Sequence, residues 1–231
     1  MSLVFTELSY ADPMKARDFA KDLRDIDEKV TQLFALVGEG VSAATDALLA
    51  SDHDAAVKII ARDQLIDRLY FDIEESVQRQ FALQAPVATD MRYLLSMLRI
   101  VPELERSGDL VRHIARRALR DLANTLSPRA RGLIERMGSV GAQLWEASAA
   151  AYADRDPGAH GRMRILDDEL DELHVAIVAE IVEAGLPTPI AIDLALVARF
   201  YERLGDHAVN VAGRMRFVAG NIGPSEEVAH N

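Results

Sequence analysis

The chain has 231 residues, with 37 acidic against 26 basic side chains and a formal net charge of -11. That balance argues against a nucleic-acid-binding protein, because neutralising phosphates requires a basic face. The absence of cysteine excludes disulfides, zinc fingers and thiolate nucleophiles, so a bound metal must use carboxylate, amide or histidine ligands. The first twenty residues show neither a basic leader nor a continuous apolar segment, and we expect a cytoplasmic protein that does not span a membrane.

Helical periodicity runs through nearly the whole chain, and alternating strands bounded by tight turns are missing, which predicts an all-α fold. Capping residues and prolines divide the chain into six helices. The expected helices cover about residues 13–50, 52–83, 87–124, 128–153, 157–185 and 189–219. The polar residues 221–231 are expected to form a flexible C-terminal tail.

A five-residue motif occurs twice in the chain. Residues 105–109 read ERSGD near the end of the third expected helix, and residues 202–206 read ERLGD near the end of the sixth. Residues 63–67 and 167–171 form a weaker echo of the same kind, each beginning and ending with Asp. Long helices joined by short turns favour antiparallel bundles, so the repeat predicts two similar three-helix bundles over residues 10–124 and 125–220.

Each half carries two pairs of acidic residues spaced four apart. The pairs are Asp63/Asp67 and Glu105/Asp109 in the first half, and Asp167/Asp171 and Glu202/Asp206 in the second. Residues four apart share one face of a helix, so both members of a pair point the same way. Clustered carboxylates repel one another unless a cation compensates, and oxygen-rich sites suit Mg, Mn or Fe. His113 and Asn210, each one turn beyond the last Asp, extend the two acidic faces as less certain ligands.

Two further features of the motif leave alternatives open. Glycine destabilises a helix interior by about 1 kcal/mol relative to alanine, yet Gly108 and Gly205 precede the aspartates. We attribute this to the close approach of a neighbouring helix. Arg106 and Arg203 directly follow the glutamates, so the acidic groups also fit a metal-free salt-bridge lattice or a solvated helix face.

The sequence resembles the PhoU family of phosphate-signalling proteins over about residues 10–219. The resemblance rests on residues 52–67, 85–92, 105–109 and 201–210. Members consist of two similar three-helix bundles whose acid-x-x-x-Asp motifs bind multinuclear metal clusters. The resemblance therefore implies two metal sites, one of Asp63, Asp67, Glu105 and Asp109 and the other of Asp167, Asp171, Glu202 and Asp206. Each would hold divalent or trivalent ions such as Fe, Mn, Mg or Zn.

Departures from the family pattern concentrate in the first repeat. The usual GDHAxNIAE has Leu110 in place of its His and His113 in place of its Asn, and the usual Glu is Arg116 in the first repeat and Gly213 in the second. We therefore expect the second site to be nearer the family norm. Beyond the first motif lies a basic patch that is either a solvated face or a docking surface for an acidic partner. It comprises Arg112, Arg116, Arg117, Arg120, Arg129, Arg131 and Arg136.

The resemblance implies a non-enzymatic adaptor. Such a protein is a negative regulator of phosphate uptake and phosphate-starvation signalling. Its partners are the transporter ATPase subunit (PstB-like) and the sensor histidine kinase (PhoR-like), and it associates peripherally with these membrane complexes. We also expect a homodimer, because long amphipathic bundles often keep an exposed apolar face.

Two other functions remain open from the residues alone. A carboxylate-bridged metalloenzyme needs a Glu-x-x-His ligand motif facing the paired acids, and the nearest candidate, Glu172 with His174, has the wrong spacing. The second function that remains open is that of a metal-free structural interaction bundle.

Overall fold

The computed structural model describes residues 13–83, 86 and 88–219. In that part the chain forms six long α-helices and one short 3-10 helix, and no strand, which confirms the all-α prediction. The elements are α1 (Pro13–Ala50), α2 (His53–Leu83), α3 (Ala88–Ala118), η1 (Leu122–Thr125), α4 (Pro128–Asp154), α5 (Ala159–Ala184) and α6 (Thr188–Val218).

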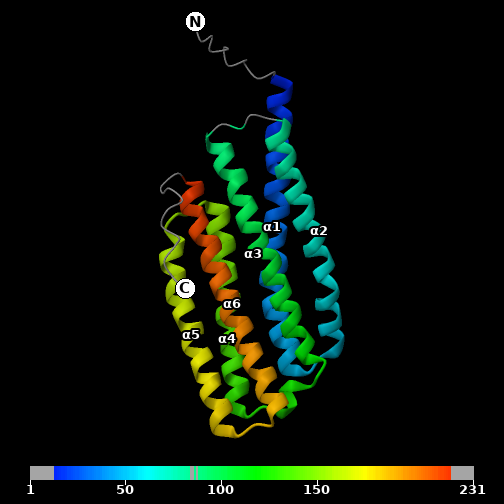
Figure 1. The fold of residues 1–231 in the computed structure, drawn as a ribbon, viewed down its shortest axis with the longest axis vertical. Helices are drawn as coiled ribbons and strands as arrows, with labels where there is room; N and C mark the ends of the chain where they lie inside the picture. The colour runs from blue at the N-terminus through cyan, green and yellow to red at the C-terminus, as the bar shows by residue number, and fades with distance from the viewer. Residues whose placement is uncertain (1–12, 84–85, 87, 220–231) are drawn as a thin grey trace, which may run out of the picture.

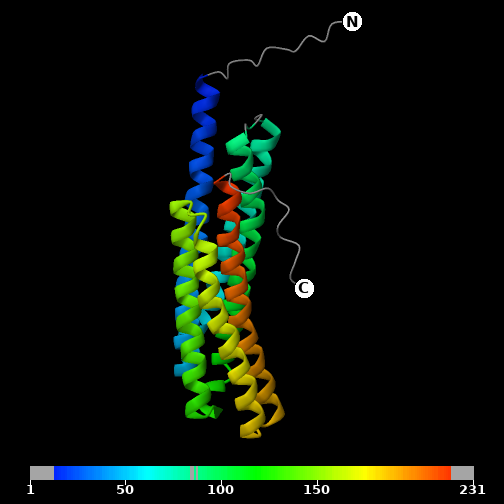
Figure 2. The ribbon, with the colours of Figure 1, turned by 90° about the vertical axis from the view of Figure 1, so that its left-hand side faces the viewer.

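The helices lie along one long axis in two groups of three (Figure 1). Helices α1, α2 and α3 pack on one another, and so do α4, α5 and α6. The groups are joined along their length by α3 against α6 and by α1 against α4. The first turns of α1 extend beyond the other helices (Figure 2). Two similar three-helix bundles are thus confirmed, the boundaries 10–124 and 125–220 stay predictions, and the expected tail 221–231 lies outside the described residues.

Helix α1 is the central core helix. It buries Ile26, Val30, Leu33, Val37 and Val41 at the spacing of one helix face, and it contacts α2, α3 and α4. Its segment Phe19–Ala50 is long and apolar enough to cross a membrane by length and composition, with half of its most apolar window buried inside the protein. The packing explains this apolar character, because a helix in contact with three others needs apolar side chains over a broad buried face.

Two of the predicted helix breaks have clear causes. Ser51 adopts a left-handed conformation with φ 52°, and the Asp52 carboxylate accepts a hydrogen bond from the Ala55 amide at 2.9 Å as α2 begins. Ser127 caps α4 in the same way, accepting from the Ala130 amide at 3.0 Å, with proline in the first turn.

The third helix is shorter than predicted. It ends at Ala118 and not at residue 124, because Asp121 adopts a left-handed conformation with φ 54° that no α-helix continues through. The Asp121 carboxylate is held 3.0 Å from His53 Nε2 at the start of α2. The turn buries Leu122 and Ala123 of η1 against the core, so tertiary contacts end the helix.

The fifth helix begins at Ala159, two residues later than predicted. The Asp156 carboxylate accepts a hydrogen bond from the Gly158 amide at 2.7 Å and pairs with Arg162. This turn, closed by the Asp156 side chain, occupies the residues before the helix. Asp commonly forms such turns ahead of proline and glycine.

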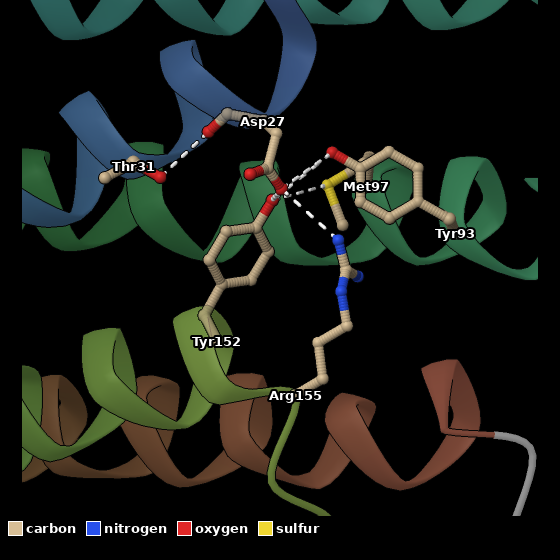
Figure 3. Close-up of polar contacts among 6 residues, drawn as sticks. All are labelled: Asp27, Thr31, Tyr93, Met97, Tyr152 and Arg155. Carbon is tan, nitrogen blue, oxygen red and sulfur yellow. Dashed lines mark hydrogen bonds and ion pairs between the residues drawn. The ribbon is translucent and has the colours of Figure 1, made fainter. Parts of the chain in front are cut away.

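A polar cluster joins α1 of the first bundle to the end of α4 (Figure 3). Tyr152 donates a hydrogen bond to Asp27 at 2.7 Å, and Tyr93 donates to the same oxygen at 3.2 Å. Arg155 lies 3.5 Å from that oxygen and 5.0 Å from the centre of the Tyr93 ring. Burial raises the pKa of both tyrosines, so they remain hydroxyl donors. The cluster ties the two bundles together near one end.

A second buried contact joins the bundles farther along. The hydroxyls of Thr45 on α1 and Tyr201 on α6 lie 2.7 Å apart, and Tyr201 is fully buried. Gly138 of α4 packs against Thr45 so closely that an added Cβ would fall 2.4 Å from its side chain. The two repeats therefore form one continuous structure, which fixes the helices that carry the acidic motifs.

Candidate metal-binding clusters

The first acidic cluster comprises Asp63 and Asp67 on α2 with Glu105 and Asp109 on α3. The two helices pack side by side, so the same-face prediction brings the four carboxylates to one seam. Their charges act on one another: the pKa of Glu105 is raised by burial first and then by Asp109 and Asp67. The periodicity predicted the shared helix face of each pair, and the family resemblance implied that the two pairs lie together; the metal site that they would form stays a prediction.

A guanidinium lies within the first cluster. Arg112 is paired through one terminal nitrogen with Asp63 and through the other with Asp109 Oδ1 at 2.6 Å. The Asp63 side chain is only 8% exposed. Burial raises the pKa of Asp63 above its usual value, while the Arg112 charge and hydrogen bond act in the opposite direction. The cluster thus carries its own cation.

The second acidic cluster comprises Asp167 and Asp171 on α5 with Glu202 and Asp206 on α6. The pKa of Asp167 is raised to about 7, first by burial and then by Asp206 and Asp171. Burial followed by Asp206 also raises the pKa of Glu202, and burial followed by Asp171 raises that of Asp206. These carboxylates share one electrostatic site with an excess of negative charge.

Partial compensation comes from α6 itself. Arg199 pairs with Glu202 Oε1 from one turn earlier on the helix. The other oxygen of that carboxylate, Oε2, is buried with no hydrogen-bond partner in the structure. A buried carboxylate oxygen without a donor is costly, and a bound cation would satisfy it.

The two motif glycines occupy places where helices approach closely. A Cβ on Gly108 would fall 2.7 Å from Ile66 Cδ1 of α2, and one on Gly205 would fall 2.5 Å from Asp167 Oδ1 and 2.8 Å from Leu170 Cδ1 of α5. The close-approach explanation is confirmed. In each repeat the glycine allows the acidic turn of one helix to lie directly against the acidic turn of the other.

The donor chemistry of the second cluster fits a hard cation better than that of the first. Arg112 occupies carboxylate oxygens of the first cluster, whereas the second has four carboxylates and a buried oxygen without a donor. Across residues 13–83, 86 and 88–219, no three Asp, Glu or His side chains stand close enough together to hold an ion. Both metal sites therefore stay predictions.

The two less certain ligands, His113 and Asn210, have different surroundings. His113 stacks on Phe200 of α6, with ring centroids 5.4 Å apart, and burial followed by neighbouring arginines lowers its pKa. Its ring is thus engaged in the contact between the repeats. Asn210 is exposed on α6, one turn beyond Asp206.

The predicted basic patch is mostly engaged inside the chain. Arg117 of α3 and Arg120 in the turn after it both pair with Asp193 of α6, at 3.4 and 3.1 Å. On α4, Arg129 pairs with Glu183 at 3.1 Å, Arg131 donates to the Leu49 and Ala123 carbonyls, and Arg136 pairs with Glu169 at 2.6 Å. These arginines connect helices, whereas Arg116 is exposed on α3. The salt-bridge alternative thus holds in part, through Arg112 and not through Arg106, which pairs with Glu103 at 3.2 Å.

One polar contact between the motifs was not predicted from the sequence. Ser107 of the first ERxGD motif lies 3.0 Å from His207 Nδ1, directly after the second motif. Both side chains are buried, and Glu103 lies 3.7 Å from the other ring nitrogen. Burial, followed by Arg203 and Arg106, lowers the pKa of His207 to about 4, so the ring is neutral near pH 7. The only signal was the motif's second copy, which places both residues on facing helices.

Fold and site together define a two-repeat helical-bundle protein with one acidic cluster per repeat. The PhoU domain model matches residues 30–118 and 134–215, once in each repeat. The chain belongs to the PhoU family.

Relatives and solved structures agree with that assignment. The chain is 32% identical over 212 residues to the phosphate-specific transport system accessory protein PhoU homolog 1 of Mycobacterium leprae, covering 90% of this chain and 96% of the relative. It is 32% identical over 209 residues to PhoU homolog 2 of Mycobacterium tuberculosis, covering 89% and 98%. The crystal structure of PhoU from Pseudomonas aeruginosa matches with a TM-score of 0.82 and 26% identity, over 88% of this chain and all of that one. The fold is shared with PhoU from Streptococcus pneumoniae, with a TM-score of 0.80 and 24% identity over 88% and 98% of the two chains.

Proposed function

We propose that this protein is a regulatory accessory protein of a phosphate-specific transport system. It lowers phosphate uptake and starvation signalling when phosphate is plentiful, as an adaptor between the transporter ATPase subunit and a sensor histidine kinase at the cytoplasmic face of the membrane. The observation that carries the proposal is similarity along nearly the whole chain to proteins named as accessory proteins of such systems. Those relatives are named for accessory roles and not for a reaction, which supports an adaptor over an enzyme.

An exposed apolar strip supports a docking role. On α5 the strip consists of Val175, Val178 and Val182, and on α6 of Ile192 and Leu196. Val182 is 77% exposed and Val178 is 44% exposed, one turn apart on the same face. Both parts lie toward the turn that joins the antiparallel helices. Exposed apolar side chains gathered on neighbouring helices are typical of a protein–protein contact.

Metal binding at the second acidic cluster is the other part of the proposal. Asp167, Asp171, Glu202 and Asp206 would hold the ion, which when bound neutralises their excess charge and cross-links α5 to α6. The support is the carboxylate donor set, the pKa of Asp167 raised to about 7 and the unpartnered oxygen of Glu202. The cluster lies on the same pair of helices as the apolar strip, so the ion would stiffen the docking helices.

The first test is recovery of the tagged protein from its native cells, grown with abundant phosphate and under starvation. The expected result is co-purification of the transporter ATPase subunit and the sensor kinase, in amounts that change with phosphate. A preparation that carries metal but neither partner in both conditions would overturn the adaptor role.

The docking strip has its own test. The double variant V178E/V182E should lose the partners, whereas I165E should keep them, because Ile165 is 73% exposed on α5 but lies outside the strip. Light scattering on the same variants separates a partner from a second copy of the chain. A wild-type dimer that becomes monomeric in V178E/V182E while partner recovery is unchanged would assign the strip to the homodimer.

A further inference from the structure

The two acidic clusters have the same acidic residues in equivalent places but differ in the residue one turn beyond the last Asp. In the first repeat Arg112 stands three positions after Asp109, and in the second Val209 stands three positions after Asp206. Residues three apart on a helix are neighbours. Each of these side chains is therefore placed to reach the carboxylates of its own cluster, and only the first can offer a charge.

Arg112 connects the two helices of the first cluster. One terminal nitrogen pairs with Asp63 on α2, and the other lies 2.6 Å from Asp109 Oδ1 on its own helix. The Arg112 side chain is 22% exposed, so the pair with Asp63 is largely shielded from water. The guanidinium thus joins the carboxylates of two helices, which is the contact that a bridging metal ion makes in an oxygen-rich site.

We infer that Arg112 is a built-in cation that replaces the metal ion of the first cluster, so that this chain takes up metal at the second cluster alone. A guanidinium donates hydrogen bonds to the carboxylate lone pairs that a metal ion would need, and its positive charge repels a second cation at the same oxygens. The position of Val209 leaves the second cluster without such a cation, while Arg199 reaches Glu202 from the opposite side along α6. The assignment of the second cluster rests on the proposed metal binding, whereas the role of Arg112 in the first rests on its own contacts.

The test counts ions in variants that exchange this one position. Protein stripped with chelator is titrated with Mn²⁺, and bound metal is measured by calorimetry and by elemental analysis. Wild type should bind about one ion per chain and R112V about two, because removal of the guanidinium opens the first cluster. R116V is the matched control, since it removes an exposed arginine one turn farther along α3 and should bind as wild type does.

The reverse exchange guards against loss of folding in R112V. V209R, at a position only 7% exposed, places a guanidinium beside the second cluster and should lose the wild-type ion; a cooperative thermal melt checks that the variant is folded. Should R112V be partly unfolded without metal, addition of Mn²⁺ should raise its melting temperature, which the inference predicts and a merely structural role for Arg112 does not.

The outcomes separate this inference from the proposed metal function. An R112V protein that binds no more Mn²⁺ than wild type, and is not stabilised by it, overturns the role of Arg112. A wild-type protein that already binds ions at both clusters also overturns the role of Arg112. The variant D63N/D109N would reveal this case, because it would lose one of the two ions. If wild type binds no ion and R112V gains one, the role of Arg112 stands and metal binding at the second cluster fails.

Discussion

The acidic clusters of the two repeats have the same four positions but differ in how their charge is compensated. In the first, Arg112 pairs with carboxylates of both helices. In the second, the strongest influences on Asp167 are burial and other carboxylates, and its pKa rises to about 7. The comparison shows that a repeated motif fixes where acidic groups meet but not what neutralises them, because one neighbouring side chain decides the balance.

Removing the guanidinium of the first cluster should have the largest effect on stability. R112M leaves the buried Asp63 without its cation, and breaking a shielded ion pair by removing one partner destabilises a protein strongly. Because Arg112 is partly exposed, we expect a loss of about 2 kcal/mol in the free energy of unfolding without metal. Urea denaturation at pH 7 checks this. An equal loss in R116M, at the exposed arginine one turn farther along α3, would remove the distinction.

Removing a negative charge from the second cluster should stabilise the fold. The native state holds a proton on Asp167 more tightly than the unfolded chain does, because its pKa rises to about 7 on folding. This group therefore stabilises the fold below about pH 4, the usual pKa of an aspartate in an unfolded chain, and the benefit is lost as pH rises toward 7. D167N cannot ionise. Without metal it should be more stable than wild type by about 1 kcal/mol at about pH 8, after allowance for solvent screening.

The pH dependence of that difference sharpens the comparison. The advantage of D167N should vanish near about pH 4, where Asp167 is protonated in both states. Thermal melts in chelator across this range, with E135Q as the control at an exposed acidic residue of α4, measure it. An advantage that grows toward low pH would contradict the assigned direction.

The motif glycines provide a test of packing in each repeat. G205A should cost about 1 kcal/mol net, because its Cβ would press on Asp167 and Leu170, and G108A should cost less, since its Cβ would press on Ile66 alone. G132A is the control: nothing lies near that position on α4, so alanine should stabilise by up to about 1 kcal/mol. A stabilised G205A would show that the close approach is not required.

The contact between the two motifs should have the smallest effect. S107A removes the partner of His207 Nδ1, and we expect a loss of about 0.5–1 kcal/mol in the free energy of unfolding at pH 7. Leu204 stands at the equivalent position of the second repeat and makes no such bond, so L204A reports packing alone. Similar dependence on pH between 4 and 7 in S107A and wild type would indicate that burial and the neighbouring arginines, and not Ser107, set the pKa of His207.

Sequence reasoning predicted the helices and the shared face of each acidic pair because both follow from local periodicity, whereas the placing of two pairs in one site came from the resemblance to the PhoU family. Apolar spacing defined the helices, and the i, i+4 pairs placed Glu105 and Asp109 on one face. It placed the end of the third helix wrongly, because the left-handed Asp121 is held by His53 from another helix. Contacts of this range have no local pattern.

Arg112 illustrates a case where the signal was present but incomplete. The i, i+3 spacing from Asp109 is a known ion-pair arrangement and could have suggested one half of its contacts. The other half, with Asp63, depends on how α2 and α3 pack. Counting Arg112 as part of a basic patch therefore missed its role as the cation of the first cluster. The junction of Asp27, Tyr93 and Tyr152 was missed for the same reason, since its members come from three helices.

Anomalous diffraction from crystals soaked in Mn²⁺ tests the central comparison most directly, because it locates the ion and does not only count it. We predict an anomalous peak among Asp167, Asp171, Glu202 and Asp206, with Arg112 still paired to Asp63 and Asp109 in the metal-free first cluster. A peak in the first cluster, with Arg112 displaced from those carboxylates, would contradict the account.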